Sequence, residues 1–170
     1  MKRQVRCGVF ETNSSSSHAV SVSRRSEPYY DTYELTESID SDGVLHSEFG
    51  EFGWGIDSYT DAETKLQYAL TMVVETECSD AKSIDDFYAT EGFNALKNAV
   101  CERLNCTDLV VDSKCEYNSD YDYLSRDGYI DHQSCEDYRS LQDFLNDYDV
   151  TLDDFIFNDN VKLIIDHDNH

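Results

Sequence analysis

The sequence contains very little proline and glycine, and it has no long apolar stretch. A single proline and seven glycines among 170 residues argue against a low-complexity or linker-dominated chain. No segment approaches the roughly 18 consecutive apolar residues that a membrane helix needs. The basic start of the chain runs into polar residues and not into an apolar segment, so we expect no secretory signal and a cytoplasmic protein.

Basic residues are scarce. The chain has 13 Lys and Arg against 36 Asp and Glu, a formal net charge of −23. Residues 1–25 carry five bases and one acid, whereas residues 26–170 carry 35 acids and eight bases. A field of this sign repels nucleic acid and membranes and attracts basic protein surfaces. We therefore predict recognition of a basic partner, with solubility as the alternative explanation of the acidic excess.

The apolar pattern predicts one α+β domain over residues 1–170, with a basic N-terminal hairpin (1–25) and an acidic body (26–170). We expect a small antiparallel sheet, two main helices and short C-terminal helices. Strands are predicted at 3–10, 19–24, 29–35, 44–49, 109–111 and 161–165. A polar turn is expected at 11–18, and residues 48–55 are expected to fold their aromatic side chains into the core, with a binding loop as the alternative.

Helix-start residues precede several of the apolar periodic segments. Thr60 and Glu63 fit a capping box for a helix that ends near residue 77. Thr90, Ser140 and Thr151 are candidate N-caps for helices at 91–104, 140–147 and 151–157, and a short helix is predicted at 84–88.

Six cysteines in a reducing compartment are free thiols or metal ligands before they are disulfides. We predict a closed structural zinc site formed by Cys106, Cys115, His132 and Cys135, with Cys101 as a competing ligand. The Cys-x4-Cys spacing is looser than in common zinc fingers, and Cys101 lies beside the apolar stripe of its helix. Ordinary buried thiols are therefore the alternative interpretation.

The serine run from Ser14 to Ser17, followed by His18, is the strongest candidate for nucleophilic catalysis. A triad requires a base and an acid brought together in space, and no nucleophile-elbow glycine pattern surrounds these serines. A structural turn or a partner-binding loop explains the run more simply. We therefore predict that the protein is not an enzyme.

The segment 116–138 alternates tyrosines with acids. Spaced carboxylates can imitate the phosphates of DNA and compete for the groove of a nucleic-acid-binding protein, and tyrosines supply apolar contact area. The alternative is a solvated acidic face with tyrosines in the core. The predicted contact residues are Asp120, Asp122, Asp127, Asp131, Glu136 and Asp137.

Residues 6–18, Arg-Cys-Gly-Val-Phe-Glu-Thr-Asn-Ser-Ser-Ser-Ser-His, resemble the start of many uncharacterised phage and mobile-element proteins of bacteria. The resemblance covers about a tenth of the chain and implies a context, not an activity. It suggests an anti-CRISPR-like inhibitor of a Cas9-type effector, since such effectors have basic DNA-binding channels. The alternatives are an enzyme that uses Ser14–His18, or a zinc-stabilised virion assembly protein.

Overall fold

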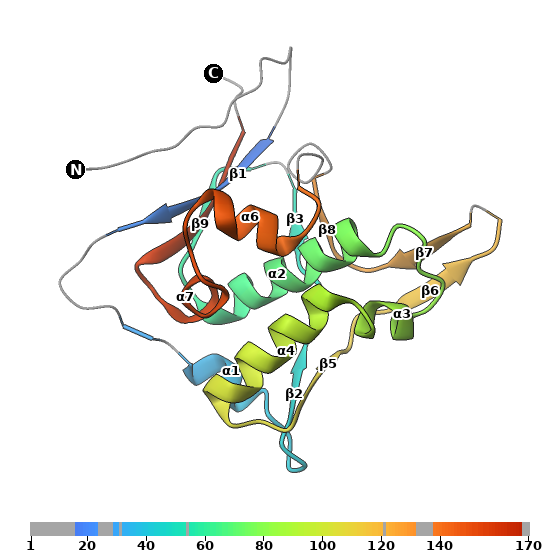
Figure 1. The fold of residues 1–170 in the computed structure, drawn as a ribbon, viewed down its shortest axis with the longest axis horizontal. Coiled ribbons are helices and arrows are strands. Elements are labelled where there is room, and N and C mark those ends of the chain that lie inside the picture. The colour runs from blue at the N-terminus through green and yellow to red at the C-terminus, as the bar shows by residue number, and fades with distance from the viewer. Residues whose placement is uncertain are drawn as a thin grey trace.

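The computed structural model describes residues 16–23, 29–30, 32–53, 55–120, 122–131 and 138–167. These residues form an α+β domain, as the sequence predicts. Helix α2 (Ala62–Glu77) lies at its centre, with α4 (Glu91–Leu104), α6 (Leu141–Asp147) and α7 (Leu152–Phe157) packed against it (Figure 1). The predicted strand at 3–10 lies outside the described residues.

Helix α2 is apolar around most of its circumference, which is typical of a helix buried in a core. Leu66, Tyr68, Leu70 and Val73 are fully buried. The helix begins one residue later than predicted, because the side chain of Asp61, and not that of Thr60, accepts the backbone N–H of Thr64 at 2.8 Å.

Two polar side chains on α2 are fully buried, and both form hydrogen bonds. The Lys65 ammonium donates to the backbone oxygens of Asn158 (3.0 Å) and Val161 (3.2 Å). The Thr71 hydroxyl donates to the oxygen of Gln67 (2.7 Å) and accepts the N–H of Gly50 (2.9 Å). Buried polar groups need such partners, and these contacts tie α2 to the segments on either side of it.

The local capping signals predict the other helices well. Thr90, Ser140 and Thr151 each accept the backbone N–H three residues ahead, as expected for N-caps. The short helix α3 (Ile84–Tyr88) is also confirmed. The predicted strand at 29–35 is wrong, because α1 (Tyr33–Glu37) is helical and buries a single apolar residue, Leu35.

The main sheet is antiparallel, in the order β1–β9–β4. The C-terminal strand β9 (Val161–His167) lies between β1 (Ser16–Val22) and β4 (Asp57–Tyr59). The predicted turn at 11–18 therefore ends earlier than expected, since Ser16, Ser17 and His18 pair with β9. Strand β1 joins distant parts of the chain, a contact that local sequence patterns cannot reveal.

Three two-stranded pairs complete the fold. Strand β2 (Val44–Ser47) is parallel to β5 (Asp108–Val111), and β3 (Glu51–Phe52) is parallel to β8 (Tyr129–Ile130). Strands β6 (Cys115–Asn118) and β7 (Tyr123–Arg126) form an antiparallel hairpin that extends away from the helices (Figure 1).

The glycine–aromatic segment follows β2. Phe49 and Phe52 are buried, which confirms the prediction for these two aromatic side chains, and Trp54 lies outside the described residues. Within the described part of the chain, no helix combines the length and apolar character needed to cross a membrane.

Candidate partner-binding surfaces

The hairpin of β6 and β7, residues 115–126, carries the acidic and tyrosine-rich sequence and is named here the tyrosine hairpin. Asp120 and Asp122 are exposed in its turn. The Asn118 side chain accepts the N–H of Asp120 at 3.1 Å, and Asp122 has a left-handed φ of 55°. Tyr117 and Tyr123 are exposed by 39% and 44%, so these two tyrosines face solvent instead of entering the core.

Bases of the chain pair with acids on and beside this hairpin. The Lys82 ammonium lies 3.6 Å from Asp122 and 5.6 Å from the centre of the Tyr117 ring. The Tyr117 hydroxyl donates to Asp122, and this bond and Lys82 lower the pKa of the Asp122 carboxyl. Lys114 pairs with Glu116 at 3.2 Å. Part of the negative charge of the hairpin is therefore compensated.

The remaining predicted contact residues have different surroundings. Asp127 is exposed beside the hairpin. Asp131 is only 4% exposed, and its backbone N–H donates to Phe52 oxygen at 2.9 Å. This carboxylate lies below the surface, where a partner does not reach it in this fold. Glu136 and Asp137 lie outside the described residues.

A second acidic surface lies at the start of α2. A shallow hollow of about 270 Å³ is lined by Ser38, His46, Ser47, Glu48, Glu63, Gln67 and Asp112. These residues come from the end of α1, from β2 and the segment after it, from α2, and from the end of β5. We name it the acidic hollow, because three of its lining side chains are carboxylates.

Carboxylates repel one another at the acidic hollow. Partial burial raises the pKa of Glu63, and the negative charges of three neighbouring acids raise it further. These acids are Glu34, Asp61 and Glu48. A like charge nearby disfavours ionisation, so these three acids add to the effect of burial on Glu63.

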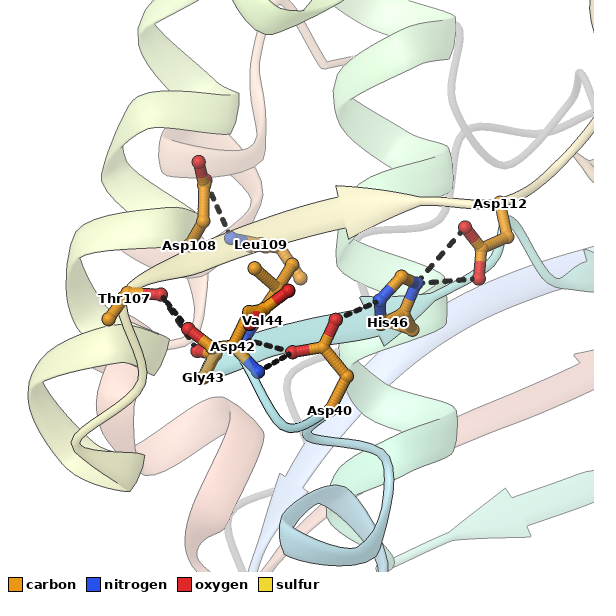
Figure 2. Close-up of polar contacts among 9 residues, drawn as sticks. All are labelled: Asp40, Asp42, Gly43, Val44, His46, Thr107, Asp108, Leu109 and Asp112. Carbon is orange, nitrogen blue, oxygen red and sulfur yellow. Dashed lines mark hydrogen bonds and ion pairs between the residues drawn. The ribbon is translucent and has the colours of Figure 1, made fainter.

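His46 lines the acidic hollow, and its imidazole lies between Asp40 and Asp112 (Figure 2). Its Nε2 lies 3.3 Å from an Asp40 oxygen, and its Nδ1 lies 3.0 Å from an Asp112 oxygen. The hydrogen bonds to Asp40 and then to Asp112 raise the pKa of the imidazole. Asp40 is itself held by the backbone N–H groups of Asp42 and Val44, both at 2.9 Å.

The two surfaces lie near opposite ends of α2. Glu63 lines the acidic hollow, whereas Glu75 binds Arg126 of the tyrosine hairpin at 2.6 Å. Twelve residues of helix separate these acids, or about 18 Å at 1.5 Å per residue. The acidic hollow is not predictable from the sequence, because its lining acids Glu48, Glu63 and Asp112 come from three separate segments that no local pattern connects.

The described members of the predicted zinc set do not come together. Cys106 precedes β5, and its Sγ lies 3.0 Å from that of Cys101. Cys115 begins β6, beyond the other end of β5. His132 and Cys135 lie outside the described residues. Among the residues that are described, no group of three or more His, Cys, Asp or Glu side chains is placed to hold a metal ion, and the zinc site remains a prediction.

His18 belongs to the core and not to a loop. It is 6% exposed in β1, and its Nδ1 lies 3.1 Å from the Tyr68 hydroxyl. Burial lowers the pKa of His18 to about 4, against the opposing charge of Asp131. The imidazole is therefore neutral at neutral pH. Ser14 and Ser15 lie outside the described residues, as do the side chains of Ser16 and Ser17, so catalysis by Ser14–His18 stays a prediction.

Comparison with protein-family models, curated proteins and solved structures finds no match to this chain.

Proposed function

We propose that this protein binds and inhibits a basic nucleic-acid-binding protein, and that the acidic hollow is the centre of its binding surface. The observation that carries the proposal is the crowding of carboxylates at the acidic hollow. A cationic side chain of a partner placed among Glu34, Glu48 and Glu63 would relieve the repulsion that adds to the effect of burial on the pKa of Glu63. A partner bearing the opposite charge is therefore the natural occupant.

Six of the eight bases of the body already make contacts with other groups of the protein. Lys65 is buried against backbone oxygens. Five others form ion pairs with carboxylates: Lys82, Lys97, Arg103, Lys114 and Arg126. With a net charge of −23, most acids have no base of the chain to pair with. The resulting field steers basic surfaces toward the protein and repels nucleic acid.

Exposed tyrosines supply the apolar part of such a surface. Tyr33, in the same helix as Glu34, is 67% exposed. On the tyrosine hairpin, Tyr117 and Tyr123 are also exposed. Tyrosine contributes large contact area at low entropic cost, and aromatic residues are enriched in protein interfaces. Acids with interspersed tyrosines can thus imitate the charge of DNA and add affinity that DNA lacks.

The first candidate partner is a CRISPR effector of the Cas9 type in the bacterial cytoplasm. The phage-like N-terminal segment supports this choice as an association. Such effectors hold nucleic acid in positively charged channels, and an acidic protein that enters the channel would exclude DNA. A nucleic-acid-binding protein of another class would fit the same surface chemistry.

The test is co-elution of the protein with a Cas9–guide complex on a size-exclusion column, with and without target DNA, at about 50 and 200 mM salt. We expect a complex that target DNA prevents and that higher salt weakens strongly. A complex insensitive to both would contradict binding at the DNA channel.

If several such effectors fail to bind, the protein is immobilised and a basic DNA-binding domain is passed over it. Immobilised heparin, another polyanion, is the comparison. Retention of the basic domain by the protein, reversed by DNA, would keep the general proposal and discard the named partner. Absence of any salt-sensitive binding would favour solubility as the reason for the acidic composition.

A further inference from the structure

The end of helix α4 brings two cysteines together. The residue after its last turn, Asn105, has left-handed φ and ψ angles of 55° and 38°. At a helix end of this kind, the side chain four residues before the left-handed residue meets the side chain just after it. Cys101 and Cys106 occupy these two positions, and their sulfur atoms are 3.0 Å apart. The local backbone therefore fixes the proximity of the thiols.

The segment that follows is anchored, so Cys106 is held in place. The N–H of Thr107 donates to Gly43 oxygen at 2.7 Å, and its hydroxyl donates to the same oxygen at 3.0 Å (Figure 2). The next residue, Asp108, pairs with Lys97 of α4 at 2.7 Å. Both cysteines remain partly exposed, so a small reagent can reach them.

We propose that Cys101 and Cys106 form a reversible disulfide by exchange with a low-molecular-weight disulfide. The thiolate of one cysteine attacks one sulfur of the reagent, which breaks the reagent's S–S bond and releases one thiolate. The other cysteine then loses its proton and attacks the sulfur of the first, which expels the second thiolate. Two protein thiols are oxidised by two electrons, and the reagent is reduced to two thiols, which take up the two protons that the cysteines lose.

The thiolate is the nucleophile in exchange reactions. Because the two sulfur atoms are 3.0 Å apart, whichever cysteine reacts first with the reagent is resolved by the other. A zinc ligand must also be a free thiolate, so this disulfide and zinc binding through Cys106 exclude each other.

The test uses the folded full-length chain with oxidised and reduced glutathione in the presence of a chelator. Free thiols are blocked at low pH after equilibration, and the chain is then unfolded and digested with trypsin. Arg103 lies between the two cysteines, so cleavage separates residues 98–103 from 104–114. We expect these two peptides to remain joined by a disulfide, with the loss of two of the six thiols.

Single variants provide the controls. Cys101→Ser and Cys106→Ser should each abolish the linked peptides. Cys115→Ser, another partly buried cysteine, should leave the link intact. Dithiothreitol should restore both thiols in the wild-type chain.

Three outcomes would overturn the proposal: glutathione retained separately on each cysteine, peptide 98–103 joined to another cysteine, or both thiols unmodified under fully oxidising conditions. Equal linkage in the urea-unfolded chain would also overturn it, because the link would then owe nothing to the folded helix end. Circular dichroism of each variant distinguishes a lost link from a lost fold.

Discussion

The acidic hollow and the tyrosine hairpin are both acidic, yet their carboxylates behave in opposite ways. At the hairpin, the Tyr117 hydroxyl and Lys82 lower the pKa of Asp122. At the hollow, burial and three neighbouring acids raise the pKa of Glu63. The hairpin has the more conspicuous sequence, whereas at the hollow neighbouring carboxylates contribute to the raised pKa of an acid.

This difference shows that a count of acids along the chain does not predict a surface potential. An acid beside a base contributes little to the distant field, whereas acids from separate segments that converge reinforce one another. The predicted contact residues were chosen by their density in sequence. The contribution of an acid to the surface potential depends more on its neighbours in space than on the number of acids near it in the sequence.

The largest expected effect is a loss of stability on substitution of Gly128, which lies where the tyrosine hairpin meets the segment that leads to the acidic hollow. Gly128, at the base of the hairpin, has φ of +79°, and a Cβ there would lie 2.5 Å from Phe49 Cβ, next to Glu48 of the hollow. Gly128→Ala should lower the free energy of unfolding by about 2–4 kcal/mol, from the left-handed backbone and the overpacking together. Urea unfolding followed by circular dichroism measures this loss.

Gly55→Ala is the matched control for that substitution, because no atom lies within 4 Å of the Cβ position there. A similar loss of stability in both variants would mean that close packing at Gly128 is not the cause.

Charge reversal compares the two surfaces directly. Glu34→Lys with Glu48→Lys should weaken binding of a basic partner about 100-fold, which is about 2.8 kcal/mol. Asp120→Lys with Asp127→Lys changes the net charge equally but should weaken binding by less than about tenfold. All four side chains are exposed, so both variants should fold, and calorimetric titration measures the affinities. Equal losses would show that only total charge matters, and a larger loss at the hairpin would reverse the assignment.

The acidic hollow should also respond to pH through His46. Its pKa is raised in the folded protein by Asp40 and Asp112, so its contribution to stability is complete below the ordinary value of 6.5 and is lost as pH rises through the raised value. Thermal unfolding between pH 6 and 9 should show this loss in the wild type and not in His46→Gln. Parallel curves would contradict the role of the imidazole. Binding of a basic partner should tighten over the same range, because the hollow loses a positive charge.

The smallest expected effect is at the hairpin. Lys82→Gln should raise the pKa of Asp122 toward its ordinary value, and Tyr117→Phe should raise it more, since the tyrosine bond is the larger cause of the lowered pKa. Carbon-detected NMR titration of the side-chain carboxyls measures both shifts. Lys114→Gln, which removes a base paired with Glu116, should leave Asp122 unchanged. A shift of Asp122 in that control would show that general charge, not the local pair, sets the pKa.

The helices were the most predictable part of this fold. Helix starts are predictable at Thr90, Ser140 and Thr151, because an N-cap hydrogen bond joins residues that are only three apart in the sequence. The same logic placed the first main helix within two residues. Residues 29–35 were predicted wrongly, because their apolar alternation is typical of a strand but only Leu35 enters the core.

The sequence alone determined the acidic excess, the α+β class and the positions of most helices, because charge is additive and helix signals are local. Only the tertiary structure decided that β1 pairs with β9, that Asp131 and His18 are buried, and that Glu34, Glu48, Asp61 and Glu63 converge. Each of these depends on contacts between residues far apart in the chain. Their formation is governed by the packing of the whole core around α2, and no short segment contains that information.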